Sequence, residues 1–158
     1  MSRIHYNDEL SPSQLGLQIG RELRTIQGNQ SQAFLRELEQ YLLTMHPKRL
    51  IENVLCDENG EVCVLGLALE RRLVQRGMTY AEAELILDPR RTWDEDDWDS
   101  FIYAAKELGV SETLAWLLME ANEDDEFGPK RTPEERYVYV LKQVRKMLKG
   151  ELSAVRLP

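Results

Sequence analysis

The sequence predicts a mainly α-helical α+β fold, a compact bundle of about six or seven helices with one short β-hairpin near residues 53–64. Apolar residues recur at helical spacing along most of the chain, and residues typical of helix caps bound each such stretch. One Asn-Gly dipeptide separates two short β-prone runs. The 158 residues suffice for one sizeable core, so we expect a single globular domain over 1–158, with flexible ends at 1–10 and 151–158.

Two helices are predicted before the hairpin. The first begins at Ser11-Pro12-Ser13 and ends at Gly28-Asn29, with an apolar stripe of Leu15, Ile19, Leu23 and Ile26. Ser31 is expected to cap the second, which ends near His46 because Pro47 disfavours helical geometry in the preceding residue. Its stripe consists of Phe34, Leu38, Tyr41, Leu42 and Met45. The tight Gly-Asn link predicts an antiparallel pair.

The predicted hairpin contains both cysteines of the chain. Asn59-Gly60 adopts a type I′ turn at little cost, and a two-residue turn there would place Cys56 directly opposite Cys63. Buried structural thiols are the favoured interpretation, with a cross-strand disulfide or a redox role as alternatives. Two thiols alone are too few for a metal site, and neither His5 nor His46 lies at a recognisable ligand spacing.

Five helices are predicted after the hairpin. The first carries Leu65, Leu69 and Leu73, ends at Gly77, and has the small Gly66 near its start, where the backbone can approach a neighbour closely. The others are expected over 80–87, from Thr92 to Gly109, from Ser111 to Asn122, and from Thr132 to Gly150. Thr132-Pro133-Glu134-Glu135 is a strong helix start, because Thr caps, Pro suits the first helical position and Glu can bond back.

The composition excludes several classes of protein. Twenty basic against 28 acidic residues give a net charge of -8, which disfavours a nucleic-acid binder because neutralising phosphates requires clustered cations. No apolar run is long enough to span a bilayer, and residues 1–10 carry no secretory signal. We therefore expect a soluble, cytoplasmic protein with no membrane contact.

Charge is distributed unevenly along the chain. Residues 88–126 hold 13 acids against 3 bases, and residues 130–149 hold 7 bases against 2 acids. The acidic stretch would steer and bind a cationic partner, although a charge run is more often a solvated surface. Trp116 lies off the apolar face predicted for its helix, which favours an interface. The expected partner-binding residues are Asp94, Glu95, Asp96, Asp97, Asp99, Trp116, Glu123, Asp124, Asp125 and Glu126.

No catalytic pattern is present. The sequence has no Gly-rich phosphate loop, no His-Glu-x-x-His and no Gly-x-Ser-x-Gly. Neither acidic run completes a calcium loop, so at most adventitious cation binding is expected. We expect no catalytic residue, no cofactor and no metal.

Three segments carry a resemblance to known proteins. They are Asp57-Glu58-Asn59-Gly60 with Cys63-Val64-Leu65-Gly66, then Asn122-Glu123-Asp124-Asp125, then Thr132-Pro133-Glu134-Glu135-Arg136. From Leu55 to Lys149 the chain resembles a loose group of small uncharacterised phage and bacterial proteins, in which a hairpin leads into a helix and an Asn-Asp loop precedes the last helix. This chain has Asn-Glu-Asp where the group tends to show Asn-Asp. The resemblance implies a hairpin-plus-helices fold and a phage-like setting, and it carries no activity.

These observations lead to one functional hypothesis with two alternatives. The leading hypothesis is a small acidic non-enzymatic protein-binding module, a phage-encoded accessory or inhibitor protein that modulates a host protein, such as a nucleic-acid-handling one. The first alternative is a structural or self-associating protein whose acidic middle pairs with the basic last helix of another copy, which would give a homodimer. The second is an enzyme of unknown class.

Overall fold

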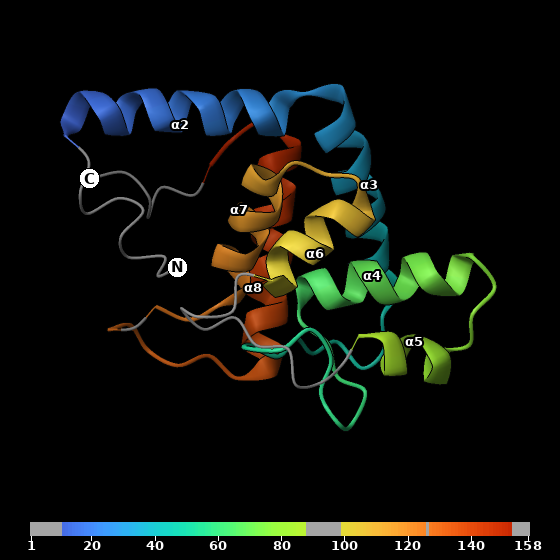
Figure 1. Ribbon diagram of the computed structural model, residues 1–158. Helices are drawn as coiled ribbons and strands as arrows, with labels where there is room; N and C mark the ends of the chain where they lie inside the picture. Colours follow the sequence, from blue (N-terminus) through green and yellow to red (C-terminus); the bar gives the residue numbers. More distant parts are fainter. Residues whose placement is uncertain (1–10, 88–98, 126, 153–158) are drawn as a thin grey trace.

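The computed structural model of the chain describes residues 11–87, 99–125 and 127–152, and Figure 1 shows how they are arranged. These ranges form seven α-helices and contain no β-strand, so the mainly helical prediction is confirmed and the hairpin is not. The helices are α2 (Pro12–Gln27), α3 (Asn29–Thr44), α4 (Val64–Gln75), α5 (Tyr80–Ile86), α6 (Asp99–Leu108), α7 (Glu112–Asn122) and α8 (Pro133–Leu148). None of these seven combines the length and apolar character needed to cross a bilayer.

The helices enclose one apolar core. α3 packs on α8 and α4, while α7 packs on α2, α4, α6 and α8. α5 packs on α4 below the rest of the bundle, as Figure 1 shows. α2 lies across the top of the bundle instead of running antiparallel to α3, so that prediction is wrong (Figure 1). Accordingly only Ile26 of the stripe predicted for α2 is fully buried.

Helix caps account for most of the observed helix starts. The Thr132 hydroxyl accepts from the Glu135 N–H at 3.1 Å, and the Glu135 carboxylate accepts from the Thr132 N–H at 2.9 Å, which is the predicted reciprocal cap. Hydrogen bonding of the Glu135 carboxylate to the Thr132 backbone N–H first, and then to the Thr132 side chain, lowers the pKa of Glu135. The predicted cap at Ser31 is wrong, because α3 begins at Asn29 directly after the extended residue Gly28.

The segment predicted as a hairpin forms an isolated antiparallel bridge between Cys56 and Val62 and no strand. The Asp57 carboxylate accepts from the backbone N–H groups of Asn59 and Glu61, each at 2.9 Å. Gly60 alone takes the positive φ of the turn, at 79°. The loop therefore has one residue more than a type I′ turn, and Cys56 lies opposite Val62 instead of Cys63.

Cys63 instead caps α4, and its sulfur accepts from the Gly66 N–H at 3.3 Å. The predicted close approach at Gly66 is confirmed, because a Cβ there would lie 1.8 Å from the Leu55 carbonyl oxygen. The same carbonyl accepts from the Cys63 N–H at 3.2 Å. These contacts fix the start of α4 against the turn segment. They therefore also fix which way the face of α4 that carries Glu70 is turned.

Candidate functional site

Polar side chains are buried in several places, among them Gln18 and Glu22 on α2, and the first region of interest is a network at the end of α7. The Asn122 amide oxygen accepts from the Val64 N–H at 2.9 Å, and its nitrogen donates to the Ile51 carbonyl at 2.8 Å. The same nitrogen donates to the Glu123 carboxylate at 2.9 Å. Asn122 therefore ties the start of α4 and the segment before the turn to the end of α7.

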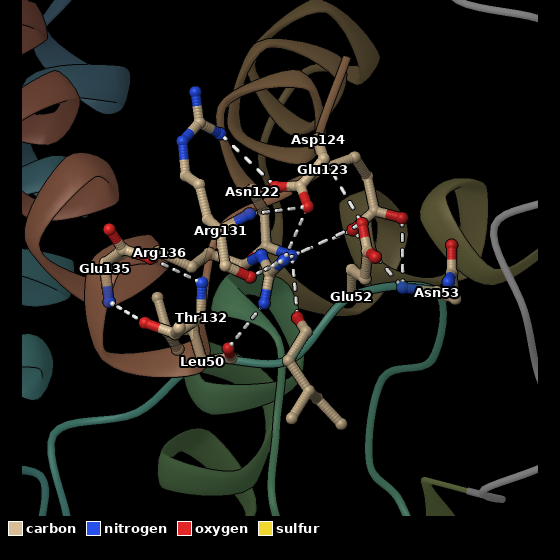
Figure 2. A network of polar contacts seen from close by, with 11 residues as sticks. Leu50, Glu52, Asn53, Asn122, Glu123, Asp124, Arg131, Thr132, Glu135 and Arg136 are labelled. Atoms are coloured by element: carbon tan, nitrogen blue, oxygen red, sulfur yellow. Dashed lines mark hydrogen bonds and ion pairs between the residues drawn. The ribbon is translucent and has the colours of Figure 1, made fainter. Parts of the chain in front are cut away.

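A buried ion pair completes this network, as Figure 2 shows. The Arg136 guanidinium donates to the Asp124 carboxylate at 3.1 Å and to the Leu50 carbonyl at 3.0 Å. Asp124 also accepts from the Arg131 N–H at 3.1 Å, and the Arg131 guanidinium lies 3.6 Å from it. Pairing of this quality offsets the desolvation of both charges, so the network is a structural joint.

Two predicted partner-binding residues belong to this joint. Glu123 and Asp124 are buried, and the Glu123 carboxylate accepts from the Asn53 N–H at 3.0 Å. The prediction that they form an exposed acidic surface is wrong, because Arg136 on α8 bonds Asp124, and the Asn53 N–H and the Asn122 amide bond Glu123. Asp125 is exposed as predicted, and Glu126 lies outside the described residues.

Trp116 is also buried, with only 4% of its surface exposed, so the prediction that it faces a partner is wrong. Its ring meets the Phe101 ring edge to face, with centroids 6.0 Å apart. The reason is the position of α7, which contacts four other helices and is buried continuously from Leu114 to Met119. A central helix has no outward face for Trp116 to occupy.

The other predicted partner-binding residues are not described. Asp94, Glu95, Asp96 and Asp97 lie outside the described residues, and Asp99 begins α6 with an undescribed side chain. Their part in binding stays a prediction.

The second polar region is an open groove with a volume of about 540 Å³. It lies between the end of α3, the turn before α4, one face of α4, and α5. Its charged and aromatic lining residues are His46, Arg49, Glu61, Glu70, Arg71, Tyr80 and Glu84. We take this groove as the candidate functional site.

Two carboxylates, those of Glu70 and Glu84, make one part of the groove acidic. Glu70 is only 8% exposed, and no hydrogen bond or ion pair joins it to another residue in the described ranges. Burial first, and then the negative charge of Glu84, raise the pKa of Glu70 to about 7. The Glu84 carboxylate lies against Gly60, where a Cβ would approach its oxygen to 2.7 Å. The folded chain thus holds two acidic groups close enough to repel each other.

The two arginines of the groove bond other side chains, and the charge of Arg71 only partly offsets the rise in the pKa of Glu70. Arg49 donates to Glu61 at 2.7 Å and also pairs with Glu134, which raises the pKa of Arg49. Arg71 donates to the Thr44 hydroxyl at 3.0 Å and lies over the Tyr41 ring at 5.7 Å. Glu70 and Glu84 are therefore left as an acidic pair without a bonded cation among the described residues.

The charges of Glu84 and Glu70 also act on the Cys56 thiol. Burial, followed by the charges of Glu84 and Glu70, raises the pKa of its thiol to about 12, so the thiol stays protonated and unreactive at neutral pH. Both cysteines are buried and neither forms a disulfide bond, as the favoured interpretation expected. Within the described residues, no three His, Cys, Asp or Glu side chains are grouped to hold a metal ion.

Sequence reasoning missed Glu70 and Glu84, although one signal was available. Glu70 lies three residues from both Leu67 and Leu73, so it shares a face of α4 with apolar residues. A carboxylate on such a face is unusual, since acidic residues are almost never fully buried without a partner. Glu84 carried no comparable signal, because its place depends on how α5 packs under the turn.

No protein-family model matches this sequence, and comparisons with curated proteins and with solved structures found no similar protein. The resemblance to the phage and bacterial group therefore stays a prediction.

Proposed function

We propose that this chain is a non-enzymatic protein-binding module that binds a cationic segment of a partner protein. The observation that carries the proposal is the acidic pair, Glu70 and Glu84, in an open groove without a bonded cation among the described residues. A buried carboxylate without a partner costs free energy, which a cationic ligand would recover on binding. The net charge of -8 favours the approach of such a partner.

Binding is favoured over catalysis by the surroundings of the pair. A carboxyl group with a pKa near 7 also suits general acid–base chemistry. Catalysis further requires groups that stabilise the charge developing in the transition state. Both arginines of the groove, Arg49 and Arg71, already bond other side chains, and the Cys56 thiol is held protonated.

The proposed partner is a protein that handles nucleic acid, within the phage-like setting that the resemblance implies. Such proteins cluster Lys and Arg to neutralise phosphates, and a clustered cationic surface is what an acidic groove complements. In this proposal Asp94, Glu95, Asp96, Asp97, Asp99 and Asp125 add long-range attraction to the contact made in the groove.

Self-association is the second candidate. It is favoured by Lys142 and Lys149, which are exposed on and just after α8 and would meet the acidic residues of another copy. Light scattering at low salt tests it: a dimeric mass that falls to monomeric at high salt supports it, and a monomeric mass throughout excludes it.

Affinity capture from the native host, with the whole chain as bait, tests the proposed function. We expect a partner retained at about 50 mM salt to be released at about 500 mM, because salt screens exposed charges. A bait carrying Asp96→Lys and Asp97→Lys should retain much less of it, and a bait carrying Glu107→Lys and Glu151→Lys, two exposed acidic residues outside the proposed contact, is the charge-matched control. Retention that is insensitive to salt and unchanged in the reversed bait would contradict the proposal.

A further inference from the structure

We propose that the groove is an arginine-binding site, in which Glu70 and Glu84 receive the guanidinium group of an arginine side chain on the partner. This inference rests on the proposed function and names the ligand chemistry of its central contact. Tyr80, about half exposed on the rim, would lie against the guanidinium plane.

The need for a cation follows from Glu70. Its side chain is more than nine-tenths buried and lines the groove, yet it bonds no other described residue. Glu84 adds a second negative charge at the same place, and the two carboxylates together would accept several donors. A bound cation would remove their mutual repulsion and satisfy both groups at once.

The choice of arginine follows from the shape and lining of the groove. A guanidinium presents five donors in a planar fork and stacks on aromatic rings, whereas an ammonium is a compact point charge. Two carboxylates with a tyrosine at the rim match the guanidinium better. A divalent metal ion is the poorer fit, because among the described residues no third His, Cys, Asp or Glu side chain is grouped with the pair closely enough to complete its shell.

The size of the groove agrees with a side chain presented on a peptide. A volume of about 540 Å³ falls in the range of ordinary ligand pockets and exceeds what one side chain fills. The walls beyond the acidic pair are lined by residues such as Met45, Pro47 and Val62. They leave room for the residues that flank the arginine.

The experiment uses the whole isotope-labelled chain and three tripeptide amides, each with glycine on both sides of one test residue. The test residues are arginine, lysine and citrulline, the last being a neutral analogue of arginine with nearly the same shape. We expect the arginine peptide to shift the amide signals of Gly60, Glu70, Tyr80 and Glu84, the lysine peptide to bind several-fold more weakly, and the citrulline peptide to give no change.

Variants then assign the contact. Glu70→Gln and Glu84→Gln should each weaken arginine-peptide binding by about tenfold or more, since each removes a charge-assisted hydrogen bond to the guanidinium. Glu107→Gln, which removes the same charge from the exposed side of α6, should leave binding unchanged. Glutamine has nearly the same shape as glutamate, so both groove variants should fold. Weaker peptide binding can then be assigned to the lost charge.

The inference is overturned if the citrulline or lysine peptide binds as tightly as the arginine peptide, or if the groove variants bind like the wild type. The captured partner separates this failure from failure of the proposed function. Partner binding that is weakened by Asp96→Lys with Asp97→Lys, and unaffected by Glu70→Gln with Glu84→Gln, would keep the proposed function and remove the groove from it. If the Asp96→Lys, Asp97→Lys pair and the Glu70→Gln, Glu84→Gln pair both weaken partner binding, the result supports both the proposed function and the arginine-binding site.

Discussion

Asp124 and Glu70 are carboxylates of almost equal burial in very different surroundings. Asp124 is 5% exposed and Glu70 8%. Asp124 is bonded by Arg136 and by the backbone of Arg131, while Glu70 lines a groove beside a second carboxylate. The difference teaches that equal burial can serve two purposes: Asp124, enclosed by donors, holds segments together, and Glu70, without a bonded partner at an opening, is a candidate for binding.

The two regions should respond oppositely to loss of charge. Removing one partner of a buried pair leaves the other charge uncompensated, which is strongly destabilising. Removing a buried charge that has no partner relieves a desolvation penalty. The sign of the change in stability therefore distinguishes a structural carboxylate from a binding one.

The largest effect is expected for Asp124→Asn. This change removes the nearer of the two carboxylates that pair with the buried Arg136 guanidinium and leaves only Glu52, at 3.8 Å, so the free energy of unfolding should fall by about 3 kcal/mol. Urea unfolding followed by circular dichroism measures it. The exposed neighbour is the control, because Asp125→Asn should change stability by less than about 0.5 kcal/mol. A similar small change for Asp124→Asn would show that the network is not a structural joint.

The next largest effect is expected for Asn122→Ala. The substitution leaves the Val64 N–H and the Ile51 carbonyl without their Asn122 partner, and the loss should be about 2–3 kcal/mol. Thermal unfolding by calorimetry measures it. Amide exchange should also quicken at Val64, whose N–H would lose its acceptor, and unchanged exchange there would count against the bond.

Glu70→Gln should act in the opposite direction. The pKa of Glu70 is raised from 4.5 to about 7 in the folded chain, so between these values the folded state holds the proton more tightly than the unfolded state. The ionised carboxylate is therefore destabilising above about pH 7, by up to about 3 kcal/mol, since one pKa unit corresponds to about 1.4 kcal/mol.

The variant should thus be more stable than the wild type at about pH 8 and equal to it below about pH 4.5. Urea midpoints across this range measure the difference. A variant less stable than the wild type at pH 8 would mean that Glu70 has a stabilising partner, and the contrast with Asp124 would fail.

The smallest effect is expected for Gly60→Ala, which combines strain at a positive φ with a contact on the Glu84 carboxylate. Its matched control is Gly77→Ala, where φ is also positive and a Cβ would meet nothing within 4 Å. Each should cost about 1 kcal/mol from backbone strain. Only Gly60→Ala should also weaken the binding of the arginine peptide. If both variants bind the peptide equally well, Glu84 does not contact it.

Local features of the fold were predictable from the sequence, and long-range ones were not. The reciprocal cap of Thr132 and Glu135 lies within one helical turn, and Gly66 follows from its place at a helix start. The register of the turn was missed because the Asp57 side chain, and not the Asn-Gly dipeptide, organises it.

The candidate site was less predictable than the fold. Glu123 and Asp124 looked like exposed acids because key donors lie far away in the sequence: the Asn53 N–H donates to Glu123, and Arg136 on α8 donates to Asp124. Trp116 looked exposed because helical periodicity assumes one buried face, and α7 is enclosed on several sides. Glu70 and Glu84 meet only through the packing of α5 under α4, which no short pattern encodes.

The most direct test is an NMR titration of the Glu70 side-chain carboxyl carbon, with and without the arginine peptide. We predict a midpoint near pH 7 in the free chain, and a midpoint that falls as the peptide saturates the groove, because a bound cation favours the charged form. A midpoint near the ordinary 4.5 in the free chain, or one near 7 that the peptide does not move, would contradict the view that this carboxylate awaits a cation.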